Sequence, residues 1–350
     1  MRIAQVMLAK GFGGAERSFV DLTNALAAQG HEVLAIGDAR GVALAALDDA
    51  PALTRFALRC YGTWDRLAEH AMRREMSRFD PLVVHAHLAR AAHLAGRAAH
   101  ALGRPTLAKT HNLVNLKYYQ HIDCLVPTTL AQERYLLAHG TAAQAIERIP
   151  NFSRVAAVEH VPPAGGPPWR IVALGRFVAK KGFDTLLEAF ARLRAAGVEA
   201  TLEIGGDGPE RARLERDIAR HGLAAAVRLR GWIDDVPTFL DGASLFVLPS
   251  RDEPFGIVLL EAMARGVPIV ATRTQGPLEI LGDAAASLVD ADDAPALAAA
   301  MRASLAGTGR GHAERALARY RDDYSAAVVV ARYAALYERL RRAALTPASS

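Results

Sequence analysis

The chain has 350 residues, 51% of them hydrophobic, and a formal net charge of +5. A chain of this length is longer than a single hydrophobic core usually serves, so two domains are expected. No apolar run reaches the roughly 18 residues that span a bilayer. The N-terminus lacks the pattern of a secretory signal, and the two cysteines lack metal-ligand spacing. These features argue against a membrane-spanning protein and predict a cytoplasmic one with reduced thiols.

The positive charge lies mainly in the first half of the chain. Residues 1–160 carry 18 Lys and Arg against 14 Asp and Glu, whereas residues 161–350 carry 24 against 23. One interpretation is a basic first half that meets an anionic lipid surface or a phosphorylated acceptor. The other is an ordinary arginine-rich solvated surface, and the sequence leaves both open. Nucleic acid is not an expected partner, because no basic-aromatic motif of a known module is present.

The chain opens with a predicted strand at 3–8, a glycine loop, a helix ending near Gln29 and a second strand at 31–36. This order predicts parallel strands. Gly13 and Gly14 would let the backbone approach a ligand at the helix start. The full dinucleotide fingerprint is absent because Glu16 occupies its last position. A tight strand-to-helix turn without a ligand is the alternative.

Residues 38–51 indicate a loop with a short helix, and residues 64–79 a longer helix. A strand at 82–86 then leads into His85 and His87, which share one face because strand side chains alternate. We expect one of these histidines in a binding cleft. A metal site would need further ligands, and none lies nearby in the sequence.

Further predicted strands at 105–109 and 124–127 alternate with helices, and residues 146–151 form a last strand edge and turn. This alternation predicts a complete doubly wound domain over residues 1–160. Residues 161–168 contain four prolines and two glycines, which favour an interdomain linker.

A second domain, 169–350, repeats the same alternation and ends in a long helix. The predicted fold class is therefore α/β, with two Rossmann-like doubly wound parallel sheets facing a central cleft.

Charged side chains of the second domain cluster on two strand-to-helix loops. Arg176 and Lys181 stand beside one helix start, where two cations suit a diphosphate. Glu253 precedes another helix, Glu261 lies about two turns inside it, and residues 255–257 can offer backbone amides at its start. Taken singly, the cations could be a surface pair and Glu261 a buried capping or ion-pair residue. Taken together, they predict a nucleotide-sugar site.

These segments resemble the glycosyltransferases of family 4, which have the two-domain GT-B fold. The matching pieces are GGAER (13–17), VVHAH (83–87), THN (110–112), IPN (149–151), GRFVAKKGFDTLLEAF (175–190), GGDGP (205–209) and PSRDEPFGIVLLEAMARGVPIVAT (249–272). The last contains an E-x7-E motif formed by Glu253 and Glu261. The resemblance covers nearly the whole chain.

The resemblance implies a retaining sugar transfer that requires no metal and no cofactor. Arg176 and Lys181 would stabilise the leaving diphosphate. Glu253 would contact the donor sugar and Glu261 the ribose. His87 would lie near the donor sugar. The catalytic set is thus predicted as Arg176, Lys181, Glu253 and His87.

The resemblance also implies donor contacts from backbone groups. The amides of Phe255, Gly256 and Ile257 would bind sugar or phosphate oxygens. Gly13 and Gly14 would allow the acceptor and the phosphates to meet closely. A UDP-, GDP- or ADP-linked sugar is the expected donor.

The acceptor is expected on first-domain loops, which vary within such folds. The residues predicted to face it are Lys109, His111, Asn112, Lys117, Tyr118 and Tyr119. The first domain resembles those of bacterial enzymes that build lipopolysaccharide or other surface glycans. A glycan or lipid-linked acceptor at an anionic inner membrane face is therefore expected.

Three other functions fit a similar scaffold. A sugar-nucleotide epimerase or phosphorylase would act on the donor without the acceptor. A catalytically idle binding protein is disfavoured by the complete charged set. A nicotinamide dehydrogenase is disfavoured because neither glycine loop has the required fingerprint.

Overall fold

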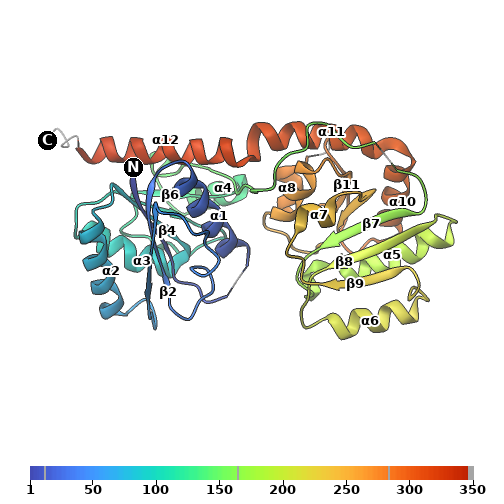
Figure 1. Cartoon of the computed structure of the whole chain (residues 1–350), viewed down its shortest axis with the longest axis horizontal. Helices are drawn as coiled ribbons and strands as arrows, with labels where there is room; N and C mark the ends of the chain where they lie inside the picture. The colour runs from blue at the N-terminus through green and yellow to red at the C-terminus, as the bar shows by residue number, and fades with distance from the viewer. Residues whose placement is uncertain (12, 164, 283, 346–350) are drawn as a thin grey trace. The chain divides into compact units, whose positions relative to one another are not determined.

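The computed structural model describes residues 1–11, 13–163, 165–282 and 284–345 (Figure 1). Contacts divide the chain into two compact units. Unit 1 contains Met1–Phe152 and the chain from Ala326 onward, and unit 2 contains Ser153–Ser325.

Unit 1 is built on a six-stranded parallel sheet with the order β3-β2-β1-β4-β5-β6. Its strands are β1 (Arg2–Met7), β2 (Glu32–Asp38), β3 (Leu53–Leu58), β4 (Val83–His87), β5 (Thr106–Lys109) and β6 (Cys124–Val126). The central strands are short apolar runs because helices cover both faces of a parallel sheet. The strand order reverses between β1 and β4, and this reversal is the position where such sheets bind ligands.

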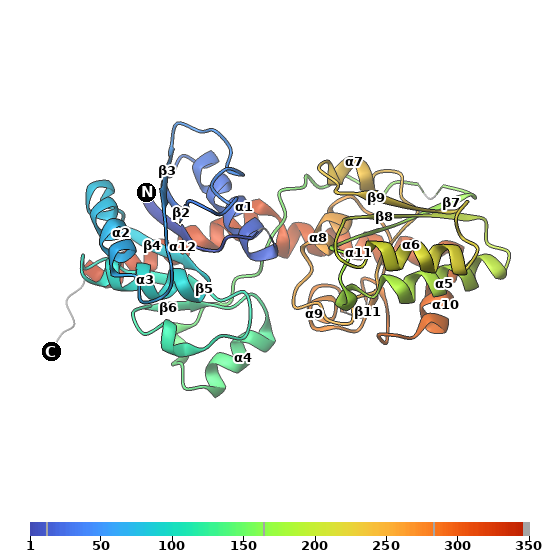
Figure 2. The ribbon, with the colours of Figure 1, turned by 90° about the horizontal axis from the view of Figure 1, so that it is seen from below.

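Helices cover both faces of the unit 1 sheet. They are α1 (Gly14–Ala28), α2 (Arg66–Phe79), α3 (Leu88–His100), α4 (Leu130–Ala138) and α12 (Ala326–Leu345). One core cluster joins α1 and α12 to the sheet, and the other joins α2 and α3. Figures 1 and 2 both show α12, in red, lying against unit 1.

Unit 2 repeats this topology, with the strand order β12-β11-β10-β7-β8-β9. Its strands are β7 (Trp169–Leu174), β8 (Ala200–Gly205), β9 (Val227–Gly231), β10 (Leu245–Leu248), β11 (Ile269–Thr272) and β12 (Ser287–Val289). Its helices are α5 (Phe183–Ala195), α6 (Arg211–Arg220), α7 (Val236–Leu240), α8 (Ile257–Ala264), α9 (Gln275–Ile280), α10 (Ala294–Ala303) and α11 (Gly309–Arg319). The order reverses between β7 and β10, which pair in parallel. The predicted pair of doubly wound parallel sheets is confirmed.

The boundaries between the two units do not lie at the predicted linker, residues 161–168. They lie between Phe152 and Ser153 and between Ser325 and Ala326. Residues 153–160 already belong to unit 2, where the Tyr320 hydroxyl donates to the carbonyls of Ser153 and Val155. The Val158 amide donates to the Ala264 carbonyl at the end of α8. The assignment of the last helix to the second domain is corrected, because α12 buries Val329, Val330, Tyr333, Leu336 and Tyr337 in the unit 1 core.

Two local predictions in unit 1 also need correction. The strand β3 was not expected, because its sequence LTRFAL places polar side chains on an exposed edge. The predicted strand edge at 146–151 is reduced to a single bridge between Leu125 and Ile146.

Candidate functional site

The candidate site of unit 2 lies where the loops after β7 and β10 leave the same edge of the sheet. The two loops are in close backbone contact at Gly182, whose φ is +64°. A Cβ added there would lie 2.1 Å from the Pro249 carbonyl oxygen. Only glycine allows this approach, so the sequence itself brings the two charged loops together.

Lys181 and Glu253 form an ion pair across the two loops. Lys181 ends the short 3-10 helix Ala179–Lys181 that leads into α5. The side chains of the pair are 16% and 9% exposed. The Ser250 hydroxyl donates to the same Glu253 carboxylate at 3.4 Å. Two predicted site residues from separate loops therefore meet at the point where the strand order reverses.

Arg251 holds the two loops together, and sequence reasoning missed it. Its guanidinium donates to the Ala179 carbonyl at 2.6 Å and pairs with Asp184 and Asp292 at 2.9 and 2.7 Å. Burial raises the pKa of Asp184, but hydrogen bonds and the charge of Arg251 outweigh burial, so the pKa is lowered overall. Two features of the sequence could have indicated this ion pair. Asp184 stands at the start of a predicted helix, and Arg251 lies two positions before Glu253 on the other loop.

Arg176 is exposed and forms no ion pair within the described residues. Its loop is supported by the segment after β8, where the Phe177 amide donates to the Asp207 carbonyl at 2.9 Å. A Cβ added to Gly206 would lie 2.0 Å from the Gly175 carbonyl oxygen, and one on Gly208 would lie 2.5 Å from that of Phe177. The GGDGP motif thus supports the loop that presents Arg176.

The start of α8 carries the other predicted donor contacts. Phe255 is 7% exposed and lies edge-on to Tyr324, with ring centroids 6.4 Å apart. Gly256 is the N-cap, with a φ of +93°, and Ile257 begins the helix. The first amides of a helix have no acceptor within it, so they can receive an anion or a hydroxyl. Glu261 is fully buried inside α8, and its contact with ribose stays a prediction.

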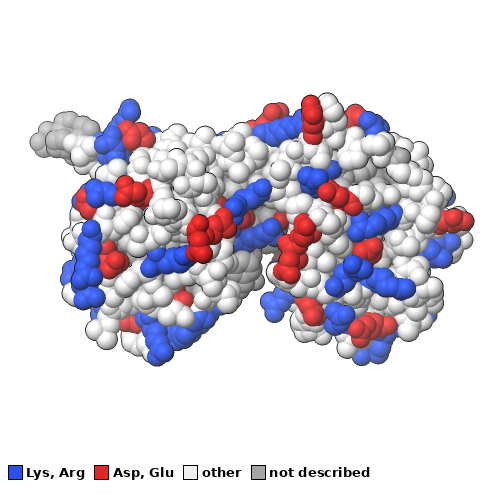
Figure 3. Space-filling model, in the orientation of Figure 1, with Lys and Arg blue, Asp and Glu red and all other residues white. Residues whose placement is uncertain are grey.

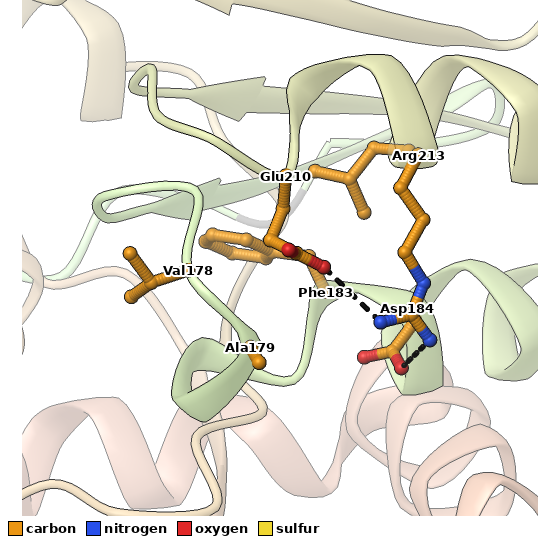
Figure 4. A pocket seen from close by; sticks show the side chains of 7 residues that line it. Val178, Ala179, Phe183, Asp184, Glu210 and Arg213 are labelled. Carbon is orange, nitrogen blue, oxygen red and sulfur yellow. Dashed lines mark hydrogen bonds and ion pairs between the residues drawn. The ribbon is translucent and has the colours of Figure 1, made fainter.

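A small pocket lies beside the Lys181 loop (Figure 4). It is lined by Val178, Ala179, Phe183, Asp184, Glu210, Arg213 and Leu214. Figure 4 shows Arg213 between Glu210 and Asp184, and it contacts both carboxylates, at 3.1 and 3.2 Å. The volume is about 10 Å³, which admits about one water molecule. This pocket is too small for a nucleotide.

In unit 1 the two strand histidines are fully buried. Their rings stack with centroids 4.4 Å apart. His87 is hydrogen-bonded to Gln5 at 2.9 Å and to His111 at 3.2 Å. Burial, followed by the charge of Lys109, lowers the pKa of His87 well below its usual value. Both ring nitrogens of His87 are held by protein groups, and its expected place near the donor sugar stays a prediction.

Of the residues predicted to face the acceptor, some are exposed and others are not. Asn112 and Lys117 are exposed, and Tyr118 is half-buried beneath the Lys117 ammonium, 4.9 Å from its ring centroid. Lys109 is 1% exposed and donates to the Tyr333 hydroxyl at 2.8 Å. Tyr119 is also buried. For Lys109 and Tyr119 the expectation is corrected, because the core holds them. His111 is 9% exposed, so it is mostly buried but still reaches the surface.

The glycine loop of unit 1 carries its own anionic cap. The Gly13 amide donates to the Glu16 carboxylate at 2.9 Å. This bond occupies the Gly13 amide at the start of α1, and the approach of Gly13 and Gly14 to a ligand stays a prediction. Gly14 is exposed, and a Cβ there would meet nothing within 4 Å. The departure from the dinucleotide fingerprint at Glu16 therefore has a structural role.

Within the described residues, no group of three or more His, Cys, Asp and Glu side chains is placed to hold a metal ion. Nor does any helix in those parts of the chain combine the length and the apolar character needed to cross a bilayer.

Two family models match the chain, one in each half. The model described as Glycosyltransferase Family 4 matches residues 12–154, and the one described as Glycosyl transferases group 1 matches residues 160–320.

Curated proteins and solved structures are similar along most of the chain. The lipopolysaccharide core biosynthesis glycosyltransferase LpsE of Rhizobium meliloti is 35% identical over 83% of this chain and 84% of that protein. LpsD of the same organism is 33% identical, with the same coverage. Anabaena Alr3699/HepE in complex with UDP has a TM-score of 0.82 and 18% identity, covering 97% of this chain and all of that one. The chain therefore belongs to the family 4 glycosyltransferases, with a group 1 domain in its second half.

Proposed function

We propose that this chain transfers a sugar from a nucleotide diphosphate to a glycan or lipid-linked acceptor in lipopolysaccharide or other surface-polysaccharide synthesis. The observation that carries the proposal is the Lys181–Glu253 pair where the unit 2 strand order reverses. Cations there suit phosphates, and a carboxylate suits sugar hydroxyls. The roles of LpsE and LpsD in lipopolysaccharide core biosynthesis, and the UDP bound by Alr3699/HepE, support a nucleotide-sugar donor and this pathway.

Lys181 is available to the donor despite its partner. An ammonium has three hydrogen-bond donors, and the bond to Glu253 uses one of them. The diphosphate would take the others, together with the exposed guanidinium of Arg176. As the bond from the sugar carbon to the phosphate oxygen breaks, its electron pair moves to the phosphate. Positive groups fixed beforehand stabilise that charge.

The proposed transfer retains configuration and needs no metal ion. The acceptor oxygen would attack the same face of the sugar from which the phosphate leaves, and the acceptor proton would pass to the leaving phosphate oxygen. Arg176 and Lys181 would supply the charge that a divalent cation supplies in other phosphate sites.

A donor panel tests the proposal. Thermal shifts with UDP-, GDP- and ADP-sugars would identify the donor, and transfer assays with that donor would follow. We expect one nucleotide sugar to raise the melting temperature. We also expect transfer that survives EDTA and a product with the donor's anomeric configuration. The absence of any thermal shift would overturn the transferase proposal, and inversion or loss of activity in EDTA would overturn the respective mechanistic part.

We further propose that unit 1 meets an anionic membrane surface through α2, which would place the enzyme at the cytoplasmic face. The α2 surface comprises Tyr61, Trp64, Arg66, Leu67, Arg73, Arg74 and Arg78. Tyr61, Trp64 and Leu67 are 63, 74 and 83% exposed, and Figure 3 shows Lys and Arg side chains gathered over this helix. Aromatic rings suit the membrane interface. Arg66 and Arg78 pair with Glu69 and Glu75 on the same helix, so Arg73 and Arg74 would contribute most, about 1 kcal/mol each near anionic lipid.

Vesicle flotation tests the α2 surface. The wild type should float with phosphatidylglycerol vesicles at low salt and should not float with phosphatidylcholine alone. Arg73→Glu/Arg74→Glu and Trp64→Ala should each lower the floated fraction. Trp232→Ala is the matched control, because Trp232 in unit 2 is 67% exposed. Equal flotation of all variants would exclude α2 as the contact.

A further inference from the structure

Arg251, in the loop after β10, uses its whole guanidinium to bind groups of two other loops. Its Nε donates to the Asp292 carboxylate at 2.7 Å. One terminal nitrogen donates to Asp184 at 2.9 Å and to the Ala179 carbonyl at 2.6 Å. The other donates to Asp184 at 3.0 Å and to the Thr185 hydroxyl at 3.2 Å. A guanidinium has five N–H groups, and these five bonds occupy all of them.

Arg251 also fixes the short 3-10 turn that carries Lys181. The two residues before Lys181 present their carbonyls to Arg251. Its side chain binds the Ala179 carbonyl, and its backbone amide donates to the Lys180 carbonyl at 2.8 Å. The backbone that leads into Lys181 is therefore held at two successive peptide groups by one residue of the neighbouring loop.

Asp292 brings a third loop into this network. It lies between β12 and α10, and its φ of +62° is a left-handed conformation that costs energy in a non-glycine residue. Its carboxylate accepts from Arg251 and, at 3.1 Å, from the Thr185 hydroxyl. An exposed ion pair usually contributes little, whereas a forked arginine within a network of charges is an exception. The contacts of Arg251 are of this second kind.

We propose that Arg251 is a positioning residue, which holds the Lys181 ammonium at the place where the leaving diphosphate of the donor gains negative charge. The diphosphate part rests on the proposed function, whereas the hold on Lys181 does not. Arg251 itself would touch no substrate, because protein groups already occupy its N–H groups. A fixed charge stabilises a transition state when it is in place beforehand, and a displacement of about 1 Å can cost about a hundredfold in rate.

Lysine side-chain NMR tests the hold on Lys181 without substrate. The chain has five lysines, so full-length protein labelled with ¹³C at the lysine Cε gives a simple spectrum, and Lys181→Ala identifies the Lys181 signal. Arg251→Gln should shift this signal, because the turn before Lys181 loses its support. Arg265→Gln is the matched control. Arg265 also forks onto a carboxylate, that of Asp241 at 2.7 and 3.0 Å, and binds the Ala156 carbonyl, but it lies at the other end of α8, so its loss should leave the signal unchanged.

A double-mutant cycle tests the effect on the reaction, with the nucleotide sugar that the donor panel identifies. Arg251→Gln should lower kcat on the order of ten- to a hundredfold. Arg251→Lys should not restore it, because an ammonium keeps the charge but cannot form the planar fork. In a Lys181→Ala background Arg251→Gln should cause little further loss, since the ammonium that it positions is absent. A general defect of folding would instead lower kcat by the same factor in both backgrounds.

An unshifted Lys181 signal in Arg251→Gln, or equal losses of kcat in the two backgrounds, would overturn the proposal. If Arg251→Gln does not fold, the milder Arg251→Lys variant decides in both measurements. If the Lys181 signal shifts as expected but the wild type turns over no nucleotide sugar, the proposed function fails and the hold of Arg251 on Lys181 stands.

Discussion

Lys181 combines a structural and a chemical task, and substitutions can separate them. Lys181→Ala would leave the Glu253 carboxylate, 9% exposed, without its cation. We expect a loss of about 1–3 kcal/mol in the free energy of unfolding. We also expect a fall in kcat on the order of 10²–10³-fold, because the leaving diphosphate loses a fixed positive charge. Urea unfolding and steady-state kinetics measure the two effects.

The double variant Lys181→Ala/Glu253→Gln is the control. It removes both charges, so the stability should largely return while the rate stays low. Wild-type turnover in Lys181→Ala would contradict the diphosphate role.

Lys109 should make the stability of unit 1 depend on pH. Burial lowers the pKa of its ammonium to about 7, against about 10.4 in an unfolded chain. Between these values the unfolded chain holds one more proton, so stability rises with pH, by at most about 1.4 kcal/mol per pH unit. Below pH 7 both states are protonated and the cost of burial is fully present.

Urea midpoints of the wild type and Lys109→Met, measured from pH 6 to 9, test this expectation. The urea midpoint of the wild type should rise relative to that of Lys109→Met as the pH rises. The exposed Lys117→Met serves as control and should run parallel to the wild type. Parallel curves for Lys109→Met would show that the buried amine does not titrate in this range.

At the residue scale, the sequence predicted which residues belong to the candidate site better than it predicted how deeply their side chains are buried. Lys181 and Glu253 could be found because each follows a strand at a helix start, and parallel strands bring such loops to one edge. The burial of Lys109 and His87 could not be predicted, because alternation along a strand gives the face on which a side chain lies and not the element that covers it. Here the cover is α12, which is remote in sequence. Arg251 was missed because its carboxylate partners lie far away in the sequence, Asp184 in the first turn of α5 and Asp292 after β12.

Among the elements, the contact at Gly182 should control the geometry of the donor loops. Gly182→Ala would force Cβ against the Pro249 carbonyl, which would push the Lys181 and Glu253 loops apart. We expect weaker binding of the donor's nucleotide diphosphate. We also expect a larger loss of stability than the left-handed backbone conformation alone would cause. Gly197→Ala is the control. Gly197 also has a left-handed φ of +83°, but a Cβ added there would meet no atom within 4 Å, so this substitution should show only the backbone cost, about 1–2 kcal/mol. Equal effects of the two substitutions on nucleotide-diphosphate titration and on unfolding would refute the role of this contact.

The C-terminal helix should be part of the unit 1 core. Leu336→Ala would remove a side chain that is 2% exposed, so we expect a loss of about 2–5 kcal/mol. Ala335→Ser, on the exposed face of the same helix, should change stability by less than about 0.5 kcal/mol. Urea unfolding measures both. If the urea midpoint of Leu336→Ala equals that of the wild type, α12 does not contribute to the stability of the unit 1 core.

For the whole molecule, the alternation of strands and helices predicted two doubly wound units, but it could not predict their boundaries. Prolines at 161–168 mark a break in regular structure, and such breaks also occur on the surface of one domain. The return of the chain into unit 1 at Ala326 depends on which core accepts the apolar face of α12. The sequence of the helix alone does not contain that information.

The discontinuity of unit 1 leads to an asymmetric prediction for fragments. Residues 153–325 form one continuous unit with its own two core clusters and the whole Lys181–Glu253 site. We therefore expect this fragment to fold alone and to bind the nucleotide diphosphate of the donor that the UDP-, GDP- and ADP-sugar panel identifies, as measured by calorimetry, with Lys181→Ala weakening the binding. Residues 1–152 lack α12 and leave Tyr333 and Tyr337 out of their core, so this fragment should be unstable unless residues 326–350 are joined to it through a short linker. A stable 1–152 fragment, or a 153–325 fragment that folds without binding the nucleotide diphosphate, would contradict this prediction.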